Sequence, residues 1–284
     1  MSEQNDSSSP SSPSYRALRI EKSGPIVEVV LIGPGKGNAM GPDFWKELPR
    51  AFAQIDQDPE VRCAIVRGEG GNFSYGLDLK AMIGELGPLI MGESLAAQRT
   101  KLLALIGELQ RSLDAVARAR VPVIAAIEGW CIGGGVDLIT ACDVRVSTAD
   151  ARFSVREVKV AMVADLGSLQ RLPAIVGQGH ARQLALTGGN LDAARALRIG
   201  LVNDVFETRE AMLDGARAMA REIADNPPLV VQGIKAVMND CQGKTIADGL
   251  RHVALWNSAF LQSHDLGEAF ASFAERRPPK YSGT

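Results

Sequence analysis

Three consecutive glycines, Gly133 to Gly135, join a short apolar run to an apolar helix, and this junction constrains the fold more than any other feature. The run before them, Pro122–Ile127 (PVIAAI), predicts a buried strand, and the helix after them extends to about Cys142. Other short strands are predicted at 26–32, 63–67, 144–147, 152–155 and 203–206, with helices at 43–57 and 102–119. Helical patterns dominate from Ser168 onward. This alternation predicts an α/β core with a helical C-terminal appendage.

Composition divides the 284 residues into three regions. Residues 1–14 are rich in Ser and Pro and predict a disordered tail, because such a segment cannot bury a core. We expect the α/β core to occupy residues 15–205 and a helical C-terminal region to occupy residues 206–284. A chain of this length buries about three quarters of its unfolded surface, so it needs no disulfide or metal for stability.

Charge and residue counts exclude several classes of protein. The formal net charge of −2 argues against a dedicated nucleic-acid binder. The four cysteines include no C-x-x-C pair, no His/Cys cluster has zinc spacing, and no apolar run reaches the ~18 residues of a membrane span. The N-terminus has no basic segment followed by an apolar one, and the C-terminal Tyr281–Thr284 is not a peroxisomal address. We therefore predict a cytoplasmic protein without a metal.

The glycine-rich stretches do not form a phosphate cradle of either common type. Leu138 stands where the third glycine of a dinucleotide fingerprint belongs, and Leu77 stands where the lysine of a P-loop belongs. Three glycines at the mouth of a helix let a ligand approach free backbone N–H groups, which suits a developing oxyanion. They also suit a tight strand-to-helix turn, and composition alone favours the turn.

Three acids lie inside apolar sequence: Asp137, Glu157 and Asp165. A buried acid without a cation has a raised pKa and can serve as a general acid or base. Each acid has an ordinary structural alternative as well, a salt bridge to a nearby arginine or a helix cap. For Asp165 that alternative is a cap on the helix that begins near Ser168.

Ser74 and the histidines are weaker candidates. Asn72 replaces the first glycine of the hydrolase G-x-S-x-G elbow around Ser74, so a loop serine is the favoured interpretation. His252 and His264 lie on amphipathic helical patterns and are expected to be ordinary core or surface residues.

Seven motifs in order resemble the crotonase, or enoyl-CoA hydratase/isomerase, superfamily, from about Tyr15 to Pro279. They are Gly37–Met40, Phe73–Leu79, Pro122–Ala126, Gly133–Leu138, Ala141–Asp143, Leu169–Pro173 and Ala269–Arg277. The resemblance implies a spiral of ββα turns followed by helices that form trimers or dimers of trimers. It also implies an acyl-CoA thioester substrate, with no cofactor beyond the coenzyme A of that substrate.

The resemblance further assigns roles to individual residues. The thioester oxygen would be held by the backbone N–H groups of Tyr75 and Gly134, although the family usually has a small residue where Tyr75 stands. Substrate or CoA contacts would come from Ala39, Asp78, Phe273 and Arg276. The last two match positions that reach a CoA bound by a neighbouring subunit.

The acids point to a subfamily. A hydratase of this family typically has Glu at the positions of Asp137 and Glu157, and Gly at the position of Asp165. The Asp–Glu–Asp pattern here resembles the Δ3,5-Δ2,4-dienoyl-CoA isomerases of fatty-acid β-oxidation. In that reaction Glu157 would remove the proton at the alpha carbon, and Asp165, expected in an apolar acyl pocket, would deliver one to carbon 6. Asp137 would tune the pKa of Glu157 or orient a water.

Three other functions remain open from the sequence. Hydration of a 2-enoyl-CoA could use Asp137 and Glu157 alone, and Asp165 is the discriminating residue. An RNA-binding homologue is disfavoured by the complete set of acids and by the absence of a basic excess. A serine hydrolase is disfavoured by the missing elbow glycine.

Overall fold

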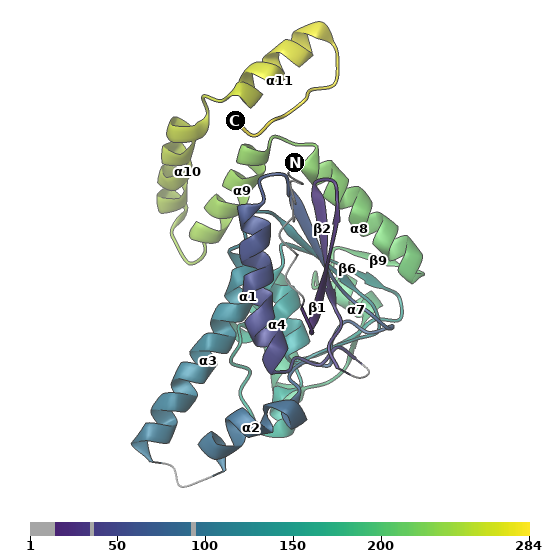
Figure 1. Cartoon of the computed structure of the whole chain (residues 1–284), viewed down its shortest axis with the longest axis vertical. Helices are drawn as coiled ribbons and strands as arrows, with labels where there is room; N and C mark the ends of the chain where they lie inside the picture. Colours follow the sequence, from purple (N-terminus) through teal and green to yellow (C-terminus); the bar gives the residue numbers. More distant parts are fainter. Residues whose placement is uncertain (1–14, 35–36, 92–94) are drawn as a thin grey trace, which may run out of the picture.

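The computed structural model describes residues 15–34, 37–91 and 95–284, so the predicted tail at 1–14 lies outside the described residues. A six-stranded sheet forms the centre (Figure 1), in the order β1-β2-β3-β4-β6-β9. Its strands are β1 (Leu18–Ser23), β2 (Ile26–Leu31), β3 (Cys63–Gly68), β4 (Val123–Ile127), β6 (Val144–Thr148) and β9 (Asp204–Phe206). β1 pairs antiparallel with β2, and the remaining pairs are parallel. The predicted α/β class is confirmed.

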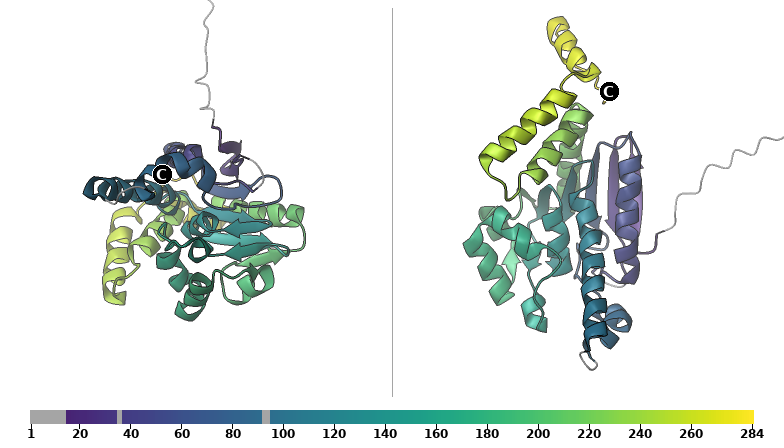
Figure 2. Two further views of the ribbon diagram at one scale, coloured as in Figure 1. Left: turned by 90° about the horizontal axis from the view of Figure 1, so that it is seen from below. Right: turned by 90° about the vertical axis from the view of Figure 1, so that its left-hand side faces the viewer.

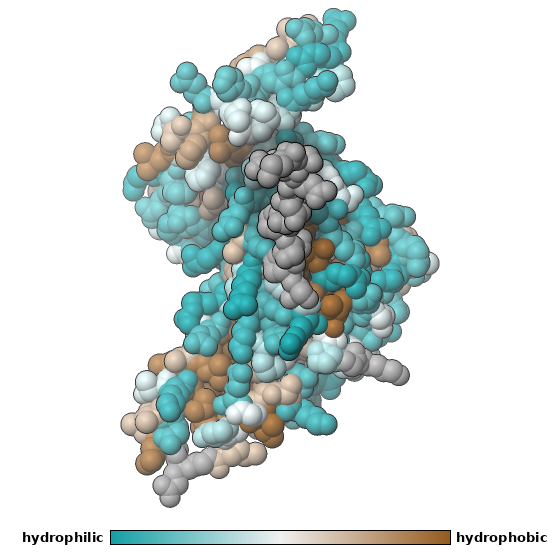
Figure 3. All heavy atoms as spheres, in the orientation of Figure 1, coloured by the Kyte–Doolittle hydropathy of each residue, from teal (hydrophilic) through white to brown (hydrophobic). Residues whose placement is uncertain are grey.

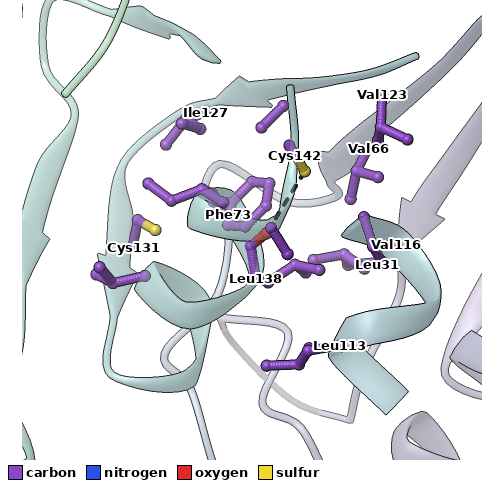
Figure 4. Packing of buried hydrophobic residues seen from close by; sticks show 14 of the residues in the cluster. Leu31, Val66, Phe73, Leu113, Val116, Val123, Ile127, Cys131, Leu138 and Cys142 are labelled. Carbon is purple, nitrogen blue, oxygen red and sulfur yellow. Dashed lines mark hydrogen bonds between the residues drawn. The ribbon is translucent and has the colours of Figure 1, made fainter. Parts of the chain in front are cut away.

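Alternate residues of the parallel strands enter two separate cores, which is why these strands are apolar on both faces. Val123, Ala125 and Ile127 of β4 pack into the larger core with α1 (Pro42–Gln57), α3 (Ala96–Ala117) and α4 (Gly134–Ala141). Figure 4 shows Val123 and Ile127 near Phe73 and Leu138 in this core. Ile124 and Ala126 face the other side, where α8 (Arg209–Ala224) covers the sheet.

A second, smaller sheet carries the loops of the candidate site. Its strands are β5 (Trp130–Ile132), β7 (Arg152–Ser154) and β8 (Leu191–Asp192). Isolated parallel bridges extend the same ladder, joining Ser74 to Cys131 and Met40 to Leu77. In two successive turns the chain places one strand in each sheet before a helix: β4 and β5 precede α4, and β6 and β7 precede η1.

The remaining elements connect these layers. They are α2 (Leu79–Ile90), the 3₁₀-helix η1 (Glu157–Val160), α5 (Ser168–Val176), α6 (Gln178–Thr187) and α7 (Ala193–Arg198). The sequence patterns did not predict α2, β1 or β5. β1 (LRIEKS) is a half-exposed edge strand with a mixed pattern, and β5 is too short to show a period. None of the described helices is long and apolar enough to cross a membrane.

Three C-terminal helices project from the body of the molecule (Figures 1 and 2): α9 (Pro228–Asp240), α10 (Ile246–Phe260) and α11 (His264–Glu275). The buried Lys235 anchors α9, because its Nζ lies 2.8 Å from the Asp143 carboxylate and donates to the Val121 carbonyl at 2.9 Å. By contrast, α8 packs on the sheet, so only part of the region 206–284 stands apart. The boundary at residue 206 stays a prediction.

Candidate active site

The three glycines form a sharp turn between β5 and α4. Gly133 has φ +54° and ψ −119°, a conformation that only glycine adopts easily, and it precedes the first turn of α4. Gly134 is the first residue of the helix, where backbone N–H groups have no partner inside the helix. The Gly134 N–H therefore lies at the N-terminal end of α4, which is the positive end of the helix dipole.

The loop containing Tyr75 lies directly beside this turn. The Ser74 N–H donates to the Trp130 carbonyl at 3.0 Å, and the Ile132 N–H donates to the Ser74 carbonyl at 2.9 Å. A Cβ added to Gly76 would lie 2.9 Å from the Gly134 nitrogen, so a side chain at position 76 would separate the two loops. The backbones at 75–76 and 134 are thus neighbours, as an oxyanion hole made of two N–H groups requires.

One of the two candidate donors, the Tyr75 N–H, has an acceptor within the chain. The Tyr75 N–H donates to the carbonyl of Gly37 at 2.7 Å. A thioester oxygen bound at this N–H must therefore take the place of the Gly37 carbonyl.

Glu157 begins η1, and its carboxyl group lies over the glycine turn. Its Oε1 is 3.1 Å from the position that a Cβ on Gly133 would occupy. Its Oε2 is buried and has no hydrogen-bond partner among the described residues. Burial raises the pKa of Glu157 to about 7, and the negative charges of Asp137 and Asp165 add to the effect. A carboxyl group with this pKa can both accept and release a proton near neutral pH.

Asp137 is 1% exposed and ties α4 to α5. Its Oδ1 accepts the backbone N–H of Ser168, the first residue of α5, at 2.6 Å. Burial raises the pKa of Asp137 to about 6, although the Ser168 hydrogen bonds oppose the rise. Asp137, rather than Asp165, therefore holds the start of α5, and the sequence alternative in which Asp165 caps that helix is wrong.

Asp165 lies in the loop between η1 and α5. Partial burial raises the pKa of its carboxyl group, and its backbone carbonyl accepts a 2.7 Å hydrogen bond from the Gln110 side chain of α3. Ala164 and Leu166 on either side are buried, but Asp165 itself is exposed and Val163 is 75% exposed. The expected apolar enclosure of Asp165 is therefore absent from the described part of a single chain, because Val163 faces solvent instead of covering the carboxyl group.

The structure separates the candidate substrate contacts into two groups. Ala39 and Asp78 lie in the same loops as Gly37 and Tyr75, and Asp78 caps α2 by accepting the Ala81 N–H at 2.9 Å. Phe273 and Arg276 lie at the end of the projecting α11 (Figure 1), and the Phe273 side chain is 86% exposed. The fold thus brings together the acids and the two donors, but α11 stands apart from them in the single chain.

The weaker candidates have structural partners. The Ser74 hydroxyl donates to the Asn38 carbonyl at 2.9 Å and accepts the Gly76 N–H at 3.0 Å, so it organises the loop. His252 lies on α10 and His264 begins α11, both outside the core.

Asn38 has a structural role that the sequence pattern did not indicate. Its side-chain amide donates to the carbonyls of Glu69 and Asn72 at 2.9 and 2.8 Å, and its φ is +48°. The motif Gly37–Met40 signalled a functional loop without indicating this role.

Comparison with known proteins identifies the family of this chain. The profile of the enoyl-CoA hydratase/isomerase family matches residues 21–284. The chain belongs to the enoyl-CoA hydratase/isomerase family. The fold agrees, because an enoyl-CoA hydratase from Bacillus anthracis superposes with a TM-score of 0.86 at 27% identity, over 95% of this chain and 100% of that one. A putative enoyl-CoA hydratase from Streptomyces coelicolor A3(2) gives a TM-score of 0.87 at 31% identity, with 100% of both chains covered.

Curated relatives resolve the subfamily. A protein of Dictyostelium discoideum named Delta(3,5)-Delta(2,4)-dienoyl-CoA isomerase, mitochondrial, is 46% identical over 270 residues, which cover 93% of this chain and 91% of the relative. A peroxisomal protein of the same name from Arabidopsis thaliana is 39% identical, with 95% of this chain and 98% of the relative covered. The human mitochondrial protein of that name is also 39% identical, covering 94% and 82%. The resemblance drawn from the Asp–Glu–Asp pattern is confirmed.

The same names overturn the predicted location. The relatives are named mitochondrial or peroxisomal, so the prediction of a cytoplasmic protein is wrong. That prediction rested on the absence of a recognised signal, and such an absence does not establish a compartment.

Proposed function

We propose that this chain is a Δ3,5-Δ2,4-dienoyl-CoA isomerase that acts on acyl-CoA thioesters in fatty-acid β-oxidation. One observation carries the proposal: three acids with raised pKa values interact electrostatically, with Asp137 on the helix that begins at Gly134, Glu157 over the glycine turn, and Asp165 in the following loop. The names of the relatives support the same activity.

The proposed reaction moves two double bonds by transferring two protons. Glu157 removes a proton from C2 of the 3,5-dienoyl-CoA, and the electron pair forms the C2=C3 bond. The C3=C4 pair then moves to C4–C5, and the C5=C6 pair takes a proton from Asp165 at C6. The product is the 2,4-diene. In the intermediate dienolate the charge lies largely on the thioester oxygen, where the N–H groups of Tyr75 and Gly134 stabilise it.

Electrons are only redistributed within the substrate in this reaction, so it requires no redox cofactor. The chemistry is complete with two carboxyl groups and two backbone donors. The coenzyme A that binds belongs to the substrate.

The direct test is turnover of a 3,5-dienoyl-CoA, followed by the ultraviolet absorbance of the conjugated 2,4-dienoyl product. The same preparation should also be given a 2-enoyl-CoA, whose absorbance is lost on hydration. Turnover of the diene with slower hydration supports the proposal. Rapid hydration without isomerisation would assign the chain to the hydratases instead.

Replacing Asp137 by Asn should shift the pH profile and leave most of the activity. The amide oxygen of Asn can still accept the Ser168 N–H, so turnover at the optimum should stay within about tenfold of wild type. Loss of the Asp137 charge should lower the pKa of Glu157, because that charge contributes to its rise. The acidic limb of kcat/KM, measured from pH 5 to 9, should therefore move to lower pH. An unmoved limb would contradict the coupling of these two acids.

We also propose that the C-terminal helices assemble the chain into a trimer or a dimer of trimers. Apolar side chains gather over α10 in Figure 3. A groove of about 290 Å³ between α9, α10 and the start of α11 is lined by Val253, Trp256, Phe260 and Leu261. Leu255 and Phe270 are exposed nearby. Such a surface is typical of a protein interface.

The oligomer has a simple test. Light scattering after size exclusion at micromolar concentration should give three or six times the chain mass of 30.2 kDa. A mass equal to that of one chain would show that this surface does not join copies of the protein.

A further inference from the structure

The Tyr75 N–H, one of the two donors of the proposed oxyanion hole, already has an acceptor inside the chain. It donates to the Gly37 carbonyl at 2.7 Å, which is a normal distance for a backbone hydrogen bond. One N–H makes one well-aligned bond, so the Gly37 carbonyl and a thioester oxygen compete for it.

The side chain of Tyr75 lies against the same glycine. A Cβ added to Gly37 would come within 2.6 Å of both Cγ and Cδ2 of the Tyr75 ring. Gly37 has φ +97°, which disfavours any residue with a Cβ. The bulky ring at position 75 and the glycine with positive φ at position 37 therefore depend on each other.

The residue after Gly37 is fixed to the loop that carries Tyr75. The buried Asn38 donates its amide to the carbonyls of Glu69 and Asn72, and its own carbonyl accepts the Ser74 hydroxyl at 2.9 Å. The Gly37 carbonyl is therefore presented to the Tyr75 N–H from an anchored backbone.

We propose that the Gly37 carbonyl is an internal acceptor that occupies the oxyanion hole of the free enzyme, and that the Tyr75 ring is the positioning residue that holds it there. This inference rests on the proposed function, which assigns the Tyr75 N–H to the thioester oxygen. Acyl-CoA binds only after the Gly37 carbonyl has left, so its apparent affinity is lowered by the fraction of enzyme in the occupied state.

The internal acceptor affects every ligand of the oxyanion hole equally. The neutral thioester oxygen and the charged oxygen of the dienolate both bind only after the Gly37 carbonyl has left, so displacing it costs the same free energy for each. The charged oxygen forms a hydrogen bond roughly twice as strong as a neutral one, so it offsets that cost more fully than the thioester oxygen does. The internal acceptor therefore raises KM and leaves kcat unchanged, because ground state and transition state are shifted equally.

Replacing Gly37 by Ala tests the proposal. The added methyl group overlaps the ring and strains the backbone, so the occupied state is disfavoured. We expect the saturated ligand octanoyl-CoA to bind about 2- to 10-fold more tightly, the scale of one lost backbone hydrogen bond. In stopped-flow measurements the gain should lie in the association rate, with dissociation unchanged, because only the fraction of binding-competent enzyme rises.

Gly70→Ala is the matched control. Gly70 has φ +77° and lies in the neighbouring loop, but its added Cβ would meet nothing within 4 Å. This variant carries a similar backbone strain without touching the ring, so its octanoyl-CoA kinetics should equal those of wild type. Binding to Gly37→Ala that is unchanged, weaker or altered through dissociation would overturn the proposal.

Hydrogen exchange of the wild-type enzyme provides a test that does not depend on the variant folding. The Tyr75 amide should be protected from exchange in the free enzyme and stay protected with octanoyl-CoA bound, since one acceptor replaces another. Rapid exchange in the free enzyme would overturn the internal acceptor. The proposed function would fail separately, if wild-type enzyme did not isomerise 3,5-dienoyl-CoA.

Discussion

Replacing Glu157 by Gln is expected to lower turnover of a 3,5-dienoyl-CoA by about 10²- to 10⁴-fold, the range lost with a positioned general base. Gln has nearly the same shape as Glu but cannot accept the C2 proton. The Glu157 carboxyl suits this task because burial raises its pKa to about 7. Exchange of the C2 protons with deuterium oxide should fall by the same factor, because it depends on the same proton transfer.

Thermal unfolding measured against pH distinguishes a variant that has lost the base from one that has lost its fold. Burial raises the pKa of Glu157 from 4.5 to about 7, so the folded chain holds this proton more tightly than the unfolded chain. The wild-type protein therefore loses stability as pH rises through that window. Gln has no charge to bury, so the variant should unfold at a higher temperature than wild type above pH 7 and at the same temperature below pH 4. Glu222→Gln, on the exposed side of α8, should change neither turnover nor this pH dependence. Wild-type turnover by Glu157→Gln would refute the base assignment.

The acidic limb of the wild-type pH profile should follow the same group. Glu157 must be ionised to accept the proton, so kcat/KM should fall below about pH 7 as the carboxylate is protonated. Burial accounts for most of this rise, and the charges of Asp137 and Asp165 add to it. A limb near the ordinary carboxylate value of about 4.3 would contradict this environment.

The sequence predicted the parts of the site that depend on local backbone. The glycines at 133–135 predicted a strand-to-helix turn with an approachable backbone, and Gly133 has the positive φ that this requires. The apolar strand at 122–127 was also predicted, because its residues are buried on both faces of a parallel sheet.

Long-range partners could not be predicted in this way. The bond from the Ser168 N–H to Asp137 joins residues 31 positions apart, and the bond from Tyr75 to Gly37 depends on how two loops pack. The exposure of Asp165 was missed for a related reason. Its apolar neighbours in sequence indicated burial, but Val163 faces solvent in the fold. A one-dimensional pattern gives the polarity of neighbours and does not give the direction of each side chain.

Replacing Asp165 by Asn or Ala should lower net isomerisation by roughly 10²-fold or more, the scale of a lost general acid. Asp165 lies eight positions after Glu157 and has a carboxyl group whose pKa is raised by partial burial. An apolar acyl tail bound beside it would remove more water from the carboxyl group and raise its pKa further, which keeps a proton available for C6. Hydration of a simple 2-enoyl-CoA involves no atom as far from the thioester as C6, so any hydratase activity should persist.

The two half-reactions make this prediction specific to Asp165. Exchange of the C2 protons in deuterium oxide should continue in both variants, because it needs only Glu157 and the backbone donors. Octanoyl-CoA should also bind with an affinity close to that of wild type. Asp225→Ala, an exposed aspartate after α8, is the control for removing a carboxyl group elsewhere. Retained isomerisation would exclude Asp165 as the acid at C6 and restore the hydratase as the leading function. Loss of exchange together with isomerisation would place Asp165 in the first proton transfer, since C2 exchange precedes any step at C6.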